Sequence, residues 1–156
     1  MLIAAIDAMA DWLPVEYLRT SRAAYATINA VHIVGMSLLV GSIVSADLRT
    51  AGLWKPDRWR EGLETCVPVA AFGLLLASVS GVMLFSVRGT AYLADPAFQI
   101  KALFLVAGLV NVVAFKVAMT KRRGGAPSRP MMLSAFLSMV IWIAVIFAGR
   151  WIAFTY

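Results

Sequence analysis

Apolar residues run along this chain in four long stretches that short polar segments separate. The stretches cover residues 23–46, 66–87, 97–119 and 131–153. Each has the length that a helix needs to cross a hydrocarbon layer, about 20 residues for a thickness of ~30 Å. Charged residues, glycines and prolines collect between them, in residues 47–64, 88–96 and 121–130. The pattern predicts four transmembrane helices.

The first 20 residues follow a different pattern, with a short apolar face and no basic start. The apolar positions at helical spacing are Ile3, Ile6, Ala10 and Leu13. Asp7 interrupts the segment and no Lys or Arg precedes it, which argues against a signal peptide. We expect a short amphipathic helix that lies on the membrane surface and that Pro14 ends or bends.

Composition fixes the class of protein. Of the 156 residues, 62% are apolar and 14% are charged, whereas soluble domains have about half and a quarter. The predicted fold is therefore an all-α integral membrane protein, a four-transmembrane-helix bundle. It forms a single membrane domain over residues 1–156 with an interfacial arm at residues 1–20. The net charge of +6 lies in short loops between apolar runs, so we expect a lipid bilayer and no nucleic acid as partner.

The basic residues are distributed unevenly between the loops. The first and third loops hold eight of them: Arg49, Lys55, Arg58, Arg60, Lys121, Arg122, Arg123 and Arg129. The N-terminal arm and the second loop hold three: Arg19, Arg22 and Arg88. Short cytoplasmic loops are enriched in Lys and Arg. The count predicts that both termini face outward, into the periplasm if the source is bacterial.

Polar side chains at membrane depth are the candidates for function, because a charge there costs several kcal/mol unless it is paired or reaches the interface. They are His32, Lys101, Asn111 and Arg150. His32 is the only histidine and lies nine residues, roughly 14 Å, below the outer end of the first span. At 100° per residue it belongs to a stripe that should face inward. The stripe consists of Tyr25, Asn29, His32, Met36, Leu39, Ile43 and Asp47.

Two interpretations of His32 stay open at this point. It either hydrogen-bonds a neighbouring helix, as polar side chains do in bundles, or binds a metal or cofactor. Lys101, Arg88 and Arg150 each lie near the outer end of a span, where each can reach the headgroups alone. Together they can form a basic ring, with Lys101 about 8 Å above His32. That offset suits a flat cofactor whose metal meets the histidine and whose carboxylates meet the basic residues.

Small residues mark the faces on which the helices should pack closely. They are Ala70, Gly73, Ala77 and Gly81 in the second span and Ser134 and Ser138 in the fourth. Such seams let helix backbones approach one another, within a chain or between subunits. We therefore expect a tight bundle in which a homo-oligomer is feasible, and we place Pro68 in the first turn of the second helix.

Two sequence motifs resemble known membrane proteins. The segment Val31-His32-Ile33-Val34-Gly35-Met36, ending in Asp47-Leu48-Arg49, resembles the first core helix of small bacterial inner-membrane proteins related to copper-resistance protein D and, more distantly, to HemJ-type protoporphyrinogen oxidase. Phe98-Gln99-Ile100-Lys101 is similar to the lysine-bearing start of a core helix in the HemJ type. The resemblance implies that His32 and Lys101 bind haem b in a protein of the bacterial inner membrane. With the count of basic residues, we expect a multi-pass protein with both termini periplasmic.

The leading functional hypothesis is a haem b-binding protein that acts in electron transfer or another redox process. His32 is the predicted axial metal ligand, Lys101, Arg88 and Arg150 neutralise the propionates, and Met36 and Asn29 complete the predicted cofactor-binding set. A single histidine leaves the sixth position to Lys101, to a methionine, to His32 of a second subunit, or to nothing. The expected redox partner is a quinol or a periplasmic protein.

Two alternatives do not need haem. The first is a non-catalytic accessory or self-assembling subunit of a larger membrane complex, with no cofactor and with His32 only bridging helices. The second is copper or other cation handling of the copper-resistance protein D type, which His32 and the methionines favour. The chain lacks any complete catalytic constellation, so whether it catalyses a reaction is open.

Overall fold

The computed structural model describes residues 13–87, 89–120 and 125–154, and every regular element in these ranges is a helix. The helices are α2 (Leu13–Thr20), α3 (Arg22–Thr50), η1 (Pro56–Arg58), α4 (Trp59–Val87), α5 (Gly89–Ala94), α6 (Pro96–Thr120), α7 (Arg129–Trp151) and η2 (Ile152–Phe154). No strand occurs among the described residues. The predicted all-α fold is confirmed.

Four of these helices are long and apolar enough to cross a membrane: α3, α4 together with η1, α6 and α7. Their outward faces carry large exposed apolar side chains, and only 6% of the most apolar window of α6 is buried in the protein. Water would solvate such a surface poorly, whereas lipid tails match it, and each helix satisfies its own backbone hydrogen bonds. The chain is a multi-pass membrane protein with four spans.

The helices extend beyond the apolar stretches of the sequence. α3 continues to Thr50 and α4 begins at Trp59, so that a short connection with η1 joins them. The reason is that a helix needs no apolar side chains to satisfy its backbone, and polar residues prolong it into the interfacial region. Pro68 consequently lies in the interior of α4 rather than in its first turn.

Local capping fixes where the spans begin near α2 and α5. The Ser21 hydroxyl accepts a hydrogen bond from the Ala24 N–H at 3.3 Å and caps α3. The Asp95 carboxylate accepts one from the Ala97 N–H at 2.6 Å, and Pro96 supplies the first residue of α6. These caps set the depth at which the following residues of α3 and α6 lie.

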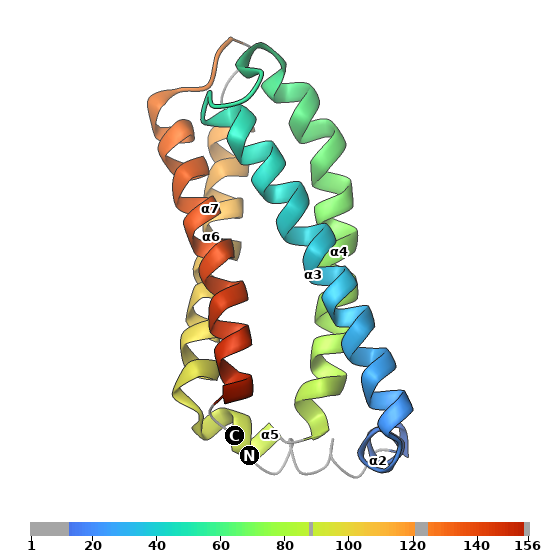
Figure 1. Cartoon of the computed structure of the whole chain (residues 1–156). Coiled ribbons are helices and arrows are strands. Elements are labelled where there is room, and N and C mark those ends of the chain that lie inside the picture. The colour runs from blue at the N-terminus through green and yellow to red at the C-terminus, as the bar shows by residue number, and fades with distance from the viewer. Residues whose placement is uncertain (1–12, 88, 121–124, 155–156) are drawn as a thin grey trace.

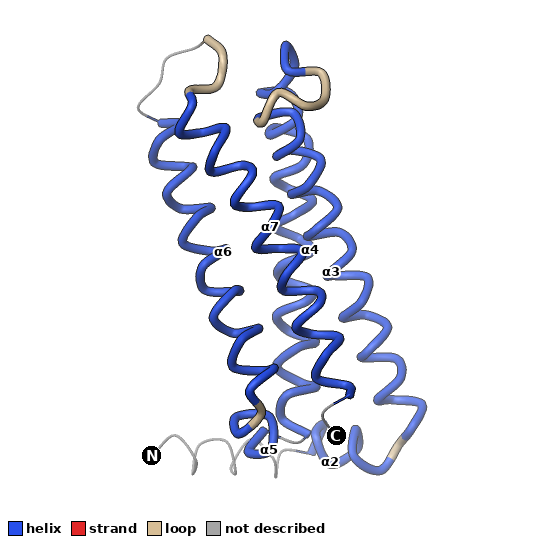
Figure 2. The backbone as a smooth tube through the Cα atoms, turned by 60° about the vertical axis from the view of Figure 1, so that its left-hand side comes forward, coloured by secondary structure: helices blue, strands red, loops and turns tan. Residues whose placement is uncertain are grey.

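The four spans pack as two pairs of helices, and a contact between one helix of each pair joins the pairs. α3 lies along α4, α6 lies along α7, and α3 meets α7 (Figures 1 and 2). In the described ranges α4 and α6 share no extensive contact. Two glycines bring α3 and α4 together: a Cβ on Gly35 would lie 2.6 Å from the Ala77 nitrogen, and one on Gly73 would lie 2.5 Å from the Leu39 nitrogen.

The core lies where the two pairs meet. Leu39, Val40, Trp142 and Val145 form a buried cluster near the middle of the bundle. A second cluster joins α3 and α7 near the loop after α3 and consists of Ala51, Ala135 and Met139. Towards the end that carries α2 and α5 the two pairs separate (Figure 1). Cavities lie on both sides of the central cluster, one lined by Asp47 and the other by His32.

The helix α2 closes part of the open end. Its Val15 and Leu18 side chains are buried, α2 contacts both α3 and α4, and the Arg19 Nε–H donates to the Val87 carbonyl at 3.2 Å. Pro14 lies in the first turn of α2. The amphipathic surface helix expected from the first residues falls mainly on residues 1–12, which lie outside the described residues.

Candidate cofactor site and a second cavity

A cavity surrounds His32 between the two helix pairs. It has two adjoining compartments of about 370 and 320 Å³, which share His32, Gly81, Phe85, Phe98 and Lys101. We call them together the His32 cavity. Each compartment has a volume within the range of ~300–1,000 Å³ that is typical of small-molecule and cofactor sites.

One ring nitrogen of His32 is held by the neighbouring helix. The Nδ1–H donates to the Ala77 carbonyl of α4 at 2.9 Å, and the Ser80 hydroxyl lies 3.1 Å from Nδ1. A carbonyl only accepts, so the hydrogen-bond network assigns the proton to Nδ1 and leaves a lone pair on Nε2 in the neutral ring. Within the described part of the chain, no hydrogen bond reaches Nε2. Metal-ligating histidines have this arrangement.

A glycine provides the room for the imidazole. A Cβ on Gly81 would lie 3.1 Å from Cε1 of His32, a tight contact that the ring would have to avoid. The small-residue seam of α4 thus serves two purposes. Gly73 and Ala77 receive the backbone of α3, and Gly81, one turn further, receives the His32 ring.

Lys101 reaches the same cavity from α6. Its side chain lies against Gly149 of α7, where a Cβ would lie 3.3 Å from Nζ. The side chain is half-buried, and among the described residues no carboxylate forms an ion pair with it. An ammonium beside apolar walls is costly without a counter-charge. The site can therefore accept an anionic group.

The other predicted cofactor residues differ in their exposure. Met36 is half-buried and lines the compartment of about 320 Å³. Asn29 and Arg150 are exposed and line the other compartment, with the Arg150 guanidinium 5.4 Å from the Phe154 ring centre. Arg88 lies outside the described residues. The cavity thus brings together five of the six predicted residues.

An aromatic wall completes this cavity and was not part of the sequence prediction. Phe85, Tyr92 and Phe98 stack with ring centres 5.4–6.3 Å apart. All three line the compartment of about 370 Å³. Phe98 lies one turn before Lys101 on α6. This spacing is the one sequence signal that could have indicated an aromatic residue in the cavity. Stacked rings offer a flat apolar surface to a planar ligand.

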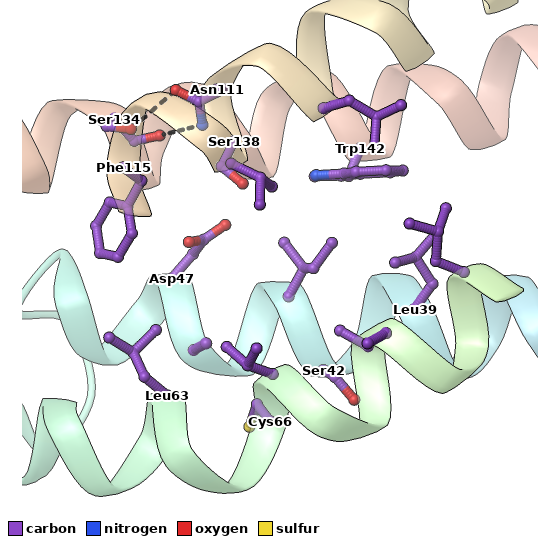
Figure 3. A pocket seen from close by; sticks show the side chains of 18 residues that line it. Leu39, Ser42, Asp47, Leu63, Cys66, Asn111, Phe115, Ser134, Ser138 and Trp142 are labelled. Carbon is purple, nitrogen blue, oxygen red and sulfur yellow. Dashed lines mark hydrogen bonds between the residues drawn. The ribbon is translucent and has the colours of Figure 1, made fainter. Parts of the chain in front are cut away.

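A second cavity of about 200 Å³ lies on the other side of the central cluster (Figure 3). All four spans line it, and we call it the Asp47 cavity. Asp47 and Trp142 are 9% and 1% exposed. Among the described residues, the Asp47 Oδ2 and the Trp142 Nε1 are buried without a hydrogen-bond partner. Sequence reasoning placed Asp47 on the His32 stripe without a role, and it did not select Trp142.

Asn111, the remaining polar residue at membrane depth, joins two helices. Its Nδ2–H donates to the Ser134 carbonyl at 3.1 Å, and the Ser134 hydroxyl donates to its Oδ1 at 2.8 Å (Figure 3). Both partners are therefore satisfied, and the pair ties α6 to α7. Its role is structural, as interhelical hydrogen bonds in membranes commonly are.

Comparison with known proteins identifies the family. Residues 15–155 match the model of a family of unknown function, DUF6644, and the chain belongs to this family. No curated protein and no solved structure matches the chain.

Proposed function

We propose that this member of the DUF6644 family binds haem b through His32 and serves in electron transfer in the bacterial inner membrane. The observation that carries the proposal is the hydrogen bond from the His32 Nδ1–H to the Ala77 carbonyl. It leaves Nε2 as the free ligand atom of a half-buried ring that borders a cavity of cofactor size.

The surroundings of His32 favour a haem over a bare metal ion. Zinc and copper sites use several protein ligands, and the described residues contain no group of three or more His, Cys, Asp or Glu that could hold an ion. A haem brings four nitrogen ligands of its own, so one axial histidine suffices. The aromatic wall of Phe85, Tyr92 and Phe98 suits a planar macrocycle.

Lys101 supplies the charge that the carboxylates of a haem require. Its ammonium borders the same cavity without an ion-pair partner among the described residues, and Arg150 lies at the mouth. When bound, haem b supplies a one-electron Fe(III)/Fe(II) couple, whose potential depends on the axial ligand and on burial. The resemblance of the His32 and Lys101 segments to HemJ-type proteins supports the same assignment.

The orientation follows from the charges of the loops. The basic loops after α3 and α6 lie on the cytoplasmic side, and His32 lies nearer the opposite, periplasmic side. Both termini are then periplasmic. The redox partner is a quinol or a periplasmic protein, and a homo-oligomer can supply a second His32 as sixth ligand.

A visible spectrum of the purified protein tests the proposal. The protein in detergent, oxidised and then reduced with dithionite, is expected to have a Soret band that shifts on reduction. His32→Ala should lose the band, and added imidazole should restore part of it by replacing the missing nitrogen ligand. A colourless wild type that takes up no haem on reconstitution would overturn the proposal. His32 would then only bridge α3 and α4, as in an accessory subunit.

A further inference from the structure

We propose that the Asp47 cavity binds the head group of a lipid-soluble quinol or quinone. The proposal does not depend on haem at His32. It rests on one buried oxygen of the Asp47 carboxyl group and on the buried indole N–H of Trp142, which face one apolar cavity. Among the described residues neither atom has a hydrogen-bond partner, and the hydrogen bond of Asp47 with Ser138 leaves Oδ2 unpaired.

Unpartnered polar atoms in such a site call for a ligand. Leaving a buried donor or acceptor unsatisfied costs about 1–3 kcal/mol, and more for a charged group. The indole nitrogen of Trp142 points along the cavity towards the end where Asp47 and Ser138 lie (Figure 3). The carboxylate accepts hydrogen bonds and the indole donates one. A ligand that satisfies both must itself offer a donor and an acceptor.

The two groups enter the cavity from different helices and at depths that differ by about one helical turn. Asp47 of α3 hydrogen-bonds Ser138 of α7, and Trp142 follows Ser138 by four residues, a rise of ~6 Å. A ligand must therefore extend along the cavity and carry a polar atom at each end. A para-quinol does so: one hydroxyl donates to Asp47, and the oxygen opposite accepts from Trp142. In the quinone form the carbonyl oxygen still accepts from Trp142.

The walls favour a ring over a hydrated ion. They are mostly aliphatic and aromatic, and the residues include Ile43, Leu63, Leu74 and Phe115. A cation would find one carboxylate, and the Trp142 N–H would point at it with the wrong polarity. The volume of about 200 Å³ is below that of whole small-molecule sites, ~300–1,000 Å³, which suits a single ring whose tail lies outside.

The opening of the cavity leads to the lipid. α3 and α7 pack together and form the back wall, whereas α4 and α6 form the sides and share no extensive contact in the described ranges. Val67 of α4 and Val112 of α6 line the cavity and are 55% and 42% exposed. The space between these helices is thus open at the level of the apolar spans. An isoprenoid tail can occupy the hydrocarbon there while the ring enters the cavity.

Binding of quinones that carry a short tail tests the proposal. Ubiquinone and menaquinone analogues are titrated into the purified full-length protein in detergent by calorimetry. We expect saturable binding of at least one class at one ring per chain. Asp47→Leu and Trp142→Phe should each weaken binding of the quinol form by about tenfold or more, since one hydrogen bond to a charged or buried group is worth ~1.4 kcal/mol or above.

Matched substitutions outside the cavity distinguish a loss of quinone binding from a general effect of the substitution on the protein. Asp57→Leu changes an exposed aspartate, and Trp151→Phe an exposed indole on the same helix as Trp142. Both should bind as the wild type does. Circular dichroism and size-exclusion profiles establish that each variant folds.

A cavity-filling variant keeps the test independent of the polar residues. Ala71→Phe on α4 adds a ring to the lining, whereas Ala114→Phe adds one to an exposed position of α6 outside the lining. Loss of binding in the first and its retention in the second would support the site. A wild type that binds neither quinone class would overturn the proposal, as would a phospholipid that co-purifies there and that quinone does not displace.

The outcome is separable from that of the haem proposal. His32→Ala is expected to bind quinone as the wild type does, because His32 lines a different cavity. Quinone binding that disappears with His32 would mean that the ring occupies the His32 cavity, and the assignment to Asp47 would be wrong.

Discussion

The two cavities use the same four helices and have opposite chemistry. The His32 cavity presents an imidazole nitrogen and an ammonium, both without a partner among the described residues, beside stacked aromatic rings. The smaller Asp47 cavity presents a carboxylate and an indole N–H between aliphatic walls. α3 is the wall that they share, because all seven residues of its His32 stripe line one cavity or the other. A single helix face can thus serve two ligands when a packed core divides it.

Helix packing explains the difference in size. Gly35 and Gly73 hold α3 and α4 at close range, so this pair does not open. α3 and α7 meet at the central cluster and beyond it, whereas towards α2 and α5 these two helices also separate (Figure 1). The larger cavity lies where the contact between the pairs is lost. Trp142 and Val145 form the division between the cavities.

The sharpest test of whether the two cavities are separate removes one key residue from each cavity. His32→Ala should lose the whole Soret band, and Asp47→Leu should retain it at wild-type intensity, since Asp47 does not line the His32 cavity. Absorbance per mole of protein, measured on both variants purified in parallel, gives the comparison. If Asp47→Leu also loses the band, the two cavities act as one site.

The position of α3, the shared wall, can be disturbed through a glycine of α4 that contacts it. A Cβ at Gly73 meets the backbone of α3, whereas one at Gly41 meets nothing within 4 Å. Gly73→Ala should lower the free energy of unfolding by about 1–3 kcal/mol and weaken both ligands. Gly41→Ala should be neutral or stabilise by up to ~1 kcal/mol, because alanine favours a helix. Thermal unfolding in detergent measures both. Equal midpoints for the two variants would contradict the close contact of α3 and α4.

Local patterns predicted the spans and the His32 stripe, because both depend on residues within one helix. A run of about 20 apolar residues is enough to indicate a crossing, and the 100° rotation per residue is enough to group His32 with Asp47. The ends of the helices were harder to predict from the sequence. Residues 47–50 and 59–65 are rich in polar side chains and are nevertheless helical, because helical turns in the interfacial region need no apolar face.

Contacts between helices could not be predicted from the sequence. Trp142 meets Asp47 in one cavity because α7 is rotated so that its indole faces α3, and no pattern within α7 alone sets that rotation. The contact of Lys101 with Gly149 likewise depends on how α6 and α7 pack. Gly81 was recognised as a small residue for packing, but its partner, the His32 ring, follows only from the register of α3 against α4.

The charge of the His32 cavity can be tested with two lysines of the same helix. Lys101 borders the cavity, whereas Lys116 is exposed towards the other end of α6. Lys101→Ala should lower haem retention about tenfold, equivalent to ~1.4 kcal/mol for one lost charge-assisted contact. Lys116→Ala should retain haem as the wild type does. Retention is measured as Soret absorbance after repeated gel filtration. Equal retention in both variants would assign Lys101 to interaction with headgroups.

The smallest effect is expected from the hydroxyl beside His32. Ser80 and Ser86 both donate to the carbonyl four residues earlier on α4, at 2.6 and 2.8 Å, but only Ser80 also lies within 3.1 Å of Nδ1. Ser80→Ala leaves the stronger bond to Ala77, so haem should stay bound while its reduction potential and Soret maximum shift slightly, as changes around a ligating histidine do. Ser86→Ala should change neither. If both substitutions change the spectrum and the potential equally, the effect of Ser80→Ala arises from a general change in α4 and not from its contact with the imidazole.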